Sequence, residues 1–382
     1  MDATSTLPDF ALMQGGPFFR LECRVHLFTP QRDKVLARTL VIVALAWLPL
    51  LFLSMFERGT ALGPLFGDLQ IHAQLLVSMP ALILSEPYVN GRIRLAVQQF
   101  LSSHLVGVGS RRSFERAVCV AIRWRDSAWV EAGLVAVCLG LSLLERIEPN
   151  RGWAFALSGG ELSPAGWWYL AVSRPLFIFL LLRWVWRGVV WAGFLFRVSR
   201  LPLALMPTHP DTMGGLGFLP VYQACFAPLV FALQMVMAAA TWRTQAAGLA
   251  ADPIPHIIPL AVIGVMATVV VFAPLVFFMP QLVKAKRRGD PAFSALAAWH
   301  SRRFERKWFH ERSSEDVLGA PEFSSLADLG STFILARKMR VFPWDPRPLM
   351  SVAAAAVLPI AILLVMDRHF LEVLKLLRQG LG

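Results

Sequence analysis

Charged residues are scarce in this chain of 382 residues. Asp, Glu, Lys and Arg make up 16% of it, whereas hydrophobic residues make up 56% and the mean hydropathy is +0.56. Soluble domains carry about 25% charged residues, so this composition excludes an ordinary soluble protein. The formal net charge is +12. In a membrane protein such an excess is typical of cytoplasmic loops near anionic headgroups, and we therefore expect no nucleic-acid partner.

Cysteine and the common catalytic motifs are also sparse. The four cysteines have no CxxC spacing, and Cys138 and Cys225 fall in apolar runs, which predicts small buried side chains rather than a disulfide framework or a metal site. The chain has no HExxH, no GxSxG and no phosphate-binding loop. The sequence therefore gives no catalytic residue, cofactor or metal ligand, although His209 with Asp211, or Glu131, keeps acid–base chemistry open as an alternative.

Long apolar runs dominate the chain and predict an all-α bundle of transmembrane helices. A bilayer is crossed by about 20 apolar residues. Seven runs of this kind occur, with six or eight spans as alternatives, at residues 36–56, 71–89, 127–144, 167–196, 221–242, 256–279 and 349–366.

Loops rich in Lys and Arg alternate with loops that have few of them, and this alternation predicts the orientation of the chain in the membrane. Five of these basic residues precede or begin the first span, seven lie in residues 90–126 and thirteen in residues 281–348, whereas the intervening loops are poor in them. Because basic loops stay in the cytoplasm, the N-terminus is expected there. The chain then divides into an interfacial segment (1–35), a six-span region (36–280) with a basic cytoplasmic segment (90–126), a basic helical insert (281–348), and a last span with an amphipathic tail (349–382).

Two arginines inside the fourth span are the most unusual feature. Arg183 and Arg187 lie four residues apart and so share one helix face. Glu86 and Glu131 are expected at a similar depth on other spans, which makes the pairs Glu86–Arg183 and Glu131–Arg187 sterically possible. Charges within a membrane usually face a partner or a wet cavity. Two interpretations follow: structural ion pairs, or a polar cavity open to the cytoplasm.

The loop after this span adds two further candidates, His209 and Asp211. They are followed by Gly214, Gly215 and Gly217, which permit positive φ or a close backbone approach. The loop is interpreted either as a structural turn in which Asp211 caps the next helix, or as the lip of the same cavity.

The basic insert contains two predicted surfaces. Lys284, Lys286, Arg287 and Arg288 follow the sixth span directly and suit anionic lipid headgroups. Further on, apolar residues recur at helical spacing and predict an amphipathic helix: Phe323, Leu326, Leu329, Phe333 and Ile334. This helix is expected to pack either on its own bundle or on a neighbouring subunit of a homo-oligomer.

Two segments resemble a family of uncharacterised bacterial multi-pass membrane proteins. They are the string from Pro207 to Phe218, which reads PTHPDTMGGLGF, and the string from Ser324 to Pro343. The resemblance implies a location in the bacterial inner membrane and implies no activity.

Three functions follow as hypotheses. The first is a protein similar to a channel or transporter, with a cytoplasm-facing cavity formed by Glu86, Glu131, Arg183, Arg187, His209 and Asp211. The second is a membrane-embedded enzyme that acts on lipid or a lipid-linked substrate. The third is a non-catalytic scaffold or sensor whose partner docks on the basic insert. Arginines paired in a dry core would argue against the first hypothesis.

Overall fold

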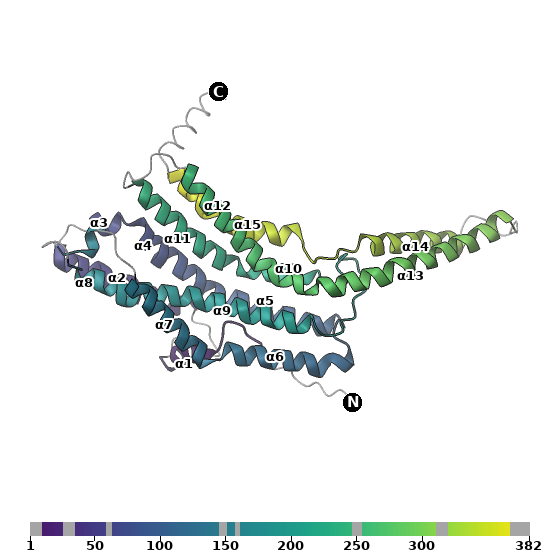
Figure 1. Cartoon of the computed structure of the whole chain (residues 1–382), viewed down its shortest axis with the longest axis horizontal. Helices are drawn as coiled ribbons and strands as arrows, with labels where there is room; N and C mark the ends of the chain where they lie inside the picture. Colours follow the sequence, from purple (N-terminus) through teal and green to yellow (C-terminus); the bar gives the residue numbers. More distant parts are fainter. Residues whose placement is uncertain are drawn as a thin grey trace, which may run out of the picture.

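The computed structural model describes residues 10–25, 35–58, 63–144, 151–156, 161–246, 254–310 and 320–366. These residues are mostly helical and contain no strand, only isolated bridges between Val106 and Leu203 and between Phe155 and Leu162. The helices run side by side in an elongated bundle, from which one helical pair projects (Figure 1). The predicted all-α class is confirmed.

Five helical stretches are long and apolar enough to cross a membrane, namely Val35–Phe56, Val108–Leu144, Pro164–Val198, Phe218–Arg243 and Ile257–His310. They correspond to five of the seven predicted spans, at α2 (Val35–Arg58), α7 (Ala128–Leu144), α9 (Arg174–Val198), α11 (Ala227–Ala246) and α12 (Ile254–Phe272). The helix α15 (Pro346–Met366) covers the predicted last span. The chain is thus built as an integral membrane protein, while seven spans and the orientation stay predictions.

The predicted second span is more polar than the others. It falls in a continuous helical stretch made of α4 (Leu69–His72), a π-helical turn at Ala73–Ser78 and α5 (Met79–Ser102). Gln74, Ser78, Glu86 and Asn90 are all buried along it. A helix that carries these groups must be surrounded by other helices, because hydrocarbon cannot satisfy their hydrogen bonds.

In two of the long helices, a π-helical turn lies just before a proline. The π-helical turns at Ala73–Ser78 and Tyr169–Ser173 end two residues before Pro80 and Pro175. Proline has no N–H and its ring clashes with the carbonyl four residues earlier, and a wider turn relieves that clash.

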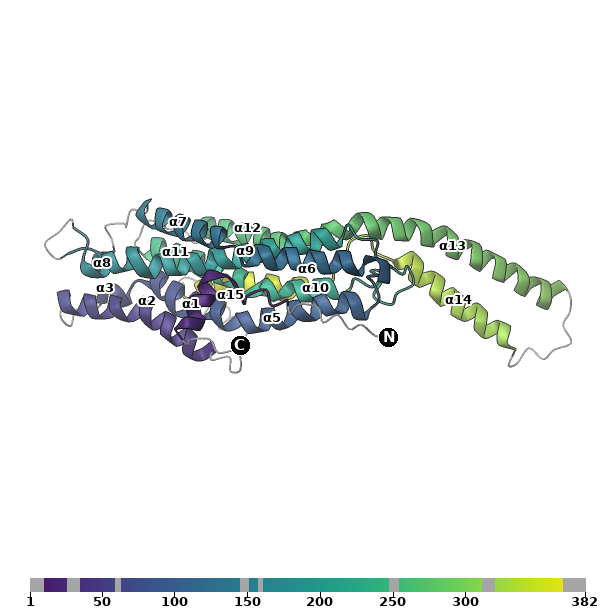
Figure 2. The same ribbon diagram turned by 90° about the horizontal axis from the view of Figure 1, so that it is seen from below.

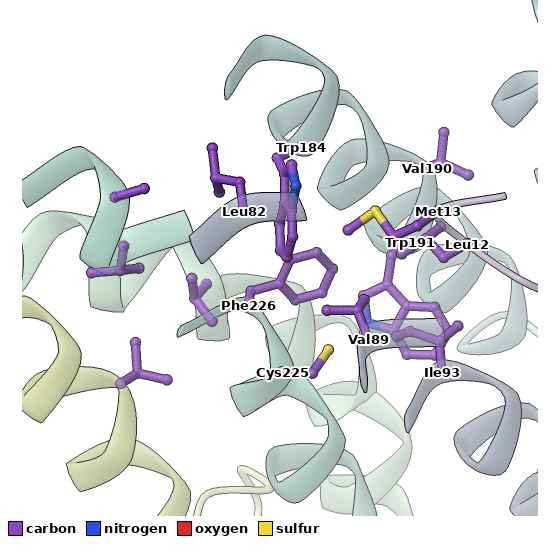
Figure 3. Close-up of a cluster of buried hydrophobic side chains, with 14 of the residues drawn as sticks. Leu12, Met13, Leu82, Val89, Ile93, Trp184, Val190, Trp191, Cys225 and Phe226 are labelled. Carbon is purple, nitrogen blue, oxygen red and sulfur yellow. The ribbon is translucent and has the colours of Figure 1, made fainter. Parts of the chain in front are cut away.

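The N-terminal segment differs from the predicted interfacial arrangement. Phe10, Ala11, Leu12 and Met13 are between 0% and 5% exposed. Leu12 and Met13 lie in the same buried cluster as Trp191 (Figure 3). The helix α1 (Gly16–Arg24) then lies on the outside of the bundle, where it contacts α7 (Figure 1). Figure 2 shows α1 in front of the bundle. The apolar run before Gly15 is therefore part of the core.

The basic insert forms an arm. The helix α13 (Met279–Glu305) continues from the 3₁₀ turn Ala273–Phe278, so that helix runs without a gap over 54 residues from Ile257 to His310. At 1.5 Å per residue this is about 80 Å, far more than the roughly 30 Å of a bilayer core. Its far part therefore leaves the membrane and pairs with α14 (Pro321–Lys338) beyond the bundle (Figures 1 and 2). The predicted amphipathic tail lies outside the described residues.

Candidate functional site

The two arginines of α9 lie in the middle of the bundle. Arg183 is 1% exposed and Arg187 is 0% exposed. They share the face of α9 that also buries Trp184 and Trp191, as expected from their helical spacing. A buried guanidinium needs partners for its charge and its five N–H groups, and the partners define the site.

Arg183 belongs to a chain of charges that connects four elements. Its Nη1 lies 3.0 Å from Oε1 of Glu86, and the other oxygen of Glu86 lies 2.5 Å from Nη2 of Arg38 on α2. Nη1 of Arg38 in turn lies 3.5 Å from Oε2 of Glu22 on α1. Both oxygens of Glu86 are thus used by guanidinium groups, and these side chains are all nearly inaccessible to solvent.

Arg187 forms the second predicted pair. Its Nη2 lies 3.5 Å from Oε1 of Glu131, and its shorter hydrogen bonds go to backbone carbonyls. Nη2 donates to the carbonyl of Gly15 at 2.7 Å, and Nη1 donates to the carbonyl of Arg125 at 2.8 Å. The pairs Glu86–Arg183 and Glu131–Arg187 both form, as the sequence indicated.

The N-terminal segment supplies the remaining partners of this network. Arg183 donates to the carbonyl of Met13 at 2.9 Å, and the N–H of Met13 donates to Oδ1 of Asn90 at 2.6 Å. The N–H of Phe18 donates to Oε2 of Glu131 at 2.7 Å. Residues 13–18 therefore occupy the space that a wet cavity in front of the arginines would need.

Two glycines allow the segment to come this close. Gly15 and Gly16 have φ of +129° and +91°, a region that side chains strongly disfavour. A Cβ on Gly15 would lie 2.2 Å from Oδ1 of Asp126, and one on Gly16 would lie 2.2 Å from Oε1 of Glu131. The Gly15–Gly16 pair thus turns the chain from its buried part into α1 directly over the second ion pair.

Glu22 is the acidic group of the network that lies outside the spans. Burial raises the pKa of Glu22 to about 7, and the charge of Arg38 opposes this shift. The nearby carboxylates of Glu86 and Glu131 raise the pKa further, while Arg183 lowers it. Near neutral pH, Glu22 is consequently divided between its neutral and ionised forms.

The loop candidates His209 and Asp211 form a separate structure. Asp211 accepts hydrogen bonds from the N–H groups of Met213, Gly215 and Gly217, at 2.7 Å, 3.1 Å and 2.8 Å for the shortest contact of each. His209 Nδ1 lies 2.8 Å from Oδ1 of Asp211. None of their contacts within the described chain is shared with the arginine network.

The loop glycines likewise have a structural role. Gly214 and Gly215 have φ of +66° and +99°, and a Cβ on Gly217 would lie 2.8 Å from that of Asp211. The loop is therefore a turn folded around the Asp211 carboxylate, and it ends as the helix α10 (Phe218–Gln223) begins. This arrangement supports the structural interpretation over a cavity lip.

The sequence did not indicate Arg38, Glu22 or Asn90 as members of the network. Arg38 lies at the edge of the first apolar run, where a basic residue is usually assigned to the headgroups. A second buried polar group was also missed, in which Asp68 lies 3.7 Å from Arg151 and accepts from Nε1 of Trp153. The residues of this second group lie in or beside loops, where a polar residue in the sequence does not indicate that the side chain is buried.

The arrangement of the network is that of a structural element. Each of the three arginines is matched by a buried carboxylate, and the backbone fills the space between them. Among the residues described, no group of three or more His, Cys, Asp or Glu side chains could hold a metal ion. The four cysteines are free thiols, of which Cys138 and Cys225 are buried.

Comparison of the chain with protein-family models, curated proteins and solved structures finds no match in any of the three. The fold and the contacts described above are therefore the basis for any functional inference.

Proposed function

We propose that this protein is a membrane scaffold or sensor, in which an ion-paired helical bundle anchors a projecting arm that binds a partner. The arm consists of α13, the π-helical turn Arg306–His310 and α14. The observation that carries the proposal is the continuous helix from Ile257 to His310, whose length exceeds the thickness of a bilayer core and so supports a helical pair outside the membrane.

The arm is held together by its own contacts. The ring centroids of Phe304 and Phe323 lie 4.8 Å apart in an edge-to-face arrangement. Nζ of Lys307 lies 2.6 Å from Oε1 of Glu322. At the base, Nζ of Lys286 donates to the carbonyl of Met339 at 2.7 Å. An arm fixed at both ends can present a surface of defined shape.

Because Lys286 binds within the arm, it is less available for the predicted contact with lipid headgroups. Its ammonium group is directed to backbone carbonyls at the base of α14, whereas Lys284, Arg287 and Arg288 are exposed. Contact of these three with anionic headgroups stays part of the proposal, as do the homo-oligomer and the bacterial inner membrane.

The surface of the arm combines exposed apolar and basic groups. Trp299 is 52% exposed, Phe309 71% and Ile334 51%. A hollow of about 860 Å³ between the two helices is bordered by basic side chains, among them Arg302, Arg303 and Arg306. Exposed aromatic residues with arginine are typical of protein interfaces, and the positive charge favours an acidic partner protein.

The buried network weighs against the channel hypothesis. A conducting path past Arg183 and Arg187 needs water beside them, and their side chains are instead in contact with carboxylates and with the backbone of residues 13–15. The enzyme hypothesis, which rested on His209 with Asp211 or on Glu131, has no comparable support, because the Asp211 carboxylate binds N–H groups of its own loop and both oxygens of Glu131 have partners.

The test is site-specific photo-crosslinking in the native membrane. A photoreactive residue at Trp299 is expected to capture one partner protein, whereas the same residue at Ile258, which is 59% exposed on the apolar part of the same helix, is expected to capture none. Arg302→Glu with Arg303→Glu should abolish the crosslink. Arg337→Glu with Lys338→Glu, the same charge change at the base of the arm, should preserve it.

Two results would contradict the proposal. The first is equal crosslinking from the positions of Trp299 and Ile258. The second is ion flux through vesicles that contain the purified protein, above that of empty vesicles, because flux would favour the channel hypothesis.

A further inference from the structure

A groove runs along the outside of the bundle between α6 (Arg111–Arg125) and the second half of α9. The two helices pack antiparallel, so that Ser113 lies near Arg200, and Trp124 lies near Val189. The groove consists of two hollows of about 320 Å³ and 410 Å³, which share Phe196 and Arg197. From Ser113 to Trp124 it extends about 16 Å at 1.5 Å per residue.

One end of the groove is basic. Arg116, Arg197 and Arg200 line it, and within the described part of the chain none of the three forms an ion pair. Arg197 donates from Nη1 to the carbonyl of Gly193 at 2.9 Å, and Arg116 donates from Nη2 to Oγ of Ser113 at 2.9 Å. A guanidinium has five N–H donors, so each retains donors for an anion.

Two of these arginines are held in place by aromatic rings. The guanidinium carbon of Arg197 lies 4.4 Å from the ring centroid of Trp124, and that of Arg200 lies 4.8 Å from the ring centroid of Phe196. Cation–π contacts of this kind orient a charge without neutralising it. The basic end is therefore positioned in advance of any ligand.

The other end of the groove is apolar. Trp124, Val189, Ala192, Phe196 and Phe277 surround it, and Val189 and Phe196 are 46% and 42% exposed. Gly193 leaves the floor of this end open. A Cβ there would lie 3.2 Å from Cζ3 of Trp124 and 3.3 Å from Nη1 of Arg197, so a larger side chain would fill the groove.

The position of the groove relative to the candidate spans indicates which kind of ligand fits it. The apolar end lies along Pro164–Val198, whereas Arg200 lies just beyond the end of this span. A molecule that fits both ends has a negative headgroup outside the hydrocarbon and an apolar chain inside it.

We propose that the α6–α9 groove is a binding site for an anionic glycerophospholipid, with the phosphate at Arg116, Arg197 and Arg200 and an acyl chain along Trp124, Gly193 and Phe277. Basic pockets between membrane helices recognise anionic headgroups through charge-assisted hydrogen bonds. The site is separate from Lys284, Arg287 and Arg288, which line neither of its two hollows.

The first test uses the unaltered protein. A phosphatidylglycerol with a photoreactive acyl chain, added to the protein in detergent, is expected to label the peptides that contain Trp124 or Val189. Unlabelled phosphatidylglycerol should compete at least about 10-fold better than phosphatidylcholine, which corresponds to one good charge-assisted contact. Equal competition by glycerol phosphate, which has no acyl chain, would assign the basic end to a free phosphate and overturn the lipid site.

The second test uses variants. Arg197→Gln with Arg200→Gln should lower the preference for phosphatidylglycerol about 10-fold or more, and Gly193→Leu should reduce labelling with both lipids. Arg302→Gln with Arg303→Gln, which removes two arginines from the arm, should change neither. Labelling that is absent from the groove in the unaltered protein overturns the proposal, whatever the variants do to folding.

Discussion

Replacing Arg187 with Met is the most direct test of how the bundle is held together. Arg187 is fully buried, and its removal leaves the carboxylate of Glu131 buried without its cationic partner. Breaking a buried ion pair from one side costs about 3–5 kcal/mol. The carbonyls of Gly15 and Arg125 also lose their donor. We therefore expect the free energy of unfolding to fall by about 3–5 kcal/mol.

A second substitution separates the charge from the shape of the side chain. Arg187→Met combined with Glu131→Gln removes both charges, and the amide oxygen introduced by the second change can still accept from the N–H of Phe18. The double variant should be about 2 kcal/mol more stable than Arg187→Met alone, because the two residues act as one unit. Arg174→Met is the control on the same helix, where about 1 kcal/mol is expected for the bond to the carbonyl of Leu141.

The assay has a global and a local readout. Unfolding in mixed micelles, followed by tryptophan fluorescence, gives the free energies. Hydrogen exchange of the amides of residues 13–18 reports whether the N-terminal segment leaves its site. A loss below about 1 kcal/mol for Arg187→Met, or additive losses in the double variant, would refute the assignment of this pair as the tie between α9 and the N-terminal segment.

Two further predictions concern single carboxylates. Because burial raises the pKa of Glu22 to about 7 from an ordinary 4.5, the folded state holds the proton more tightly than the unfolded state. The contribution of Glu22 to the free energy of unfolding should be greatest below pH 4.5 and fall by up to about 3 kcal/mol as the pH rises to about 7. In the variant Glu22→Gln, the free energy of unfolding should change less between these pH values. Asp211→Ala should cost about 2–3 kcal/mol in the same unfolding assay, since several N–H groups lose one charged acceptor. His209→Ala, at a ring that is 36% exposed, should cost less than about 1 kcal/mol, and equal losses at the two positions would contradict the role given to the carboxylate.

The part of the site that depended on helix geometry was predictable from the sequence. Spacing placed Arg183 and Arg187 on one face, and the depth of Glu86 and Glu131 on other spans was enough to propose both pairs. The grouping of His209 with the arginines rested on depth alone, and depth does not fix which loop residues meet which helix. The structure instead folds that loop around Asp211.

The insertion of the N-terminal segment could not be predicted in the same way. Residues 10–13 are a short apolar run without a periodic pattern, and such a run is compatible with the membrane surface as well as with a core. The deciding feature is Gly15–Gly16, whose positive φ angles turn the chain at the ion pair. A pair of glycines in a sequence does not show which conformation they adopt.

The helix from Ile257 to His310 connects the embedded part of the bundle to the end of the arm. Its part beyond Phe278 is about 48 Å long, so a change of roughly 10° in the tilt of the embedded part moves the tip by roughly 8 Å. Bilayer thickness acts on helix tilt, and the tip carries the exposed Trp299 and Phe309. If the helix moves as one body, a small change in the lipid around the bundle would displace the end of the arm by about the length of a side chain.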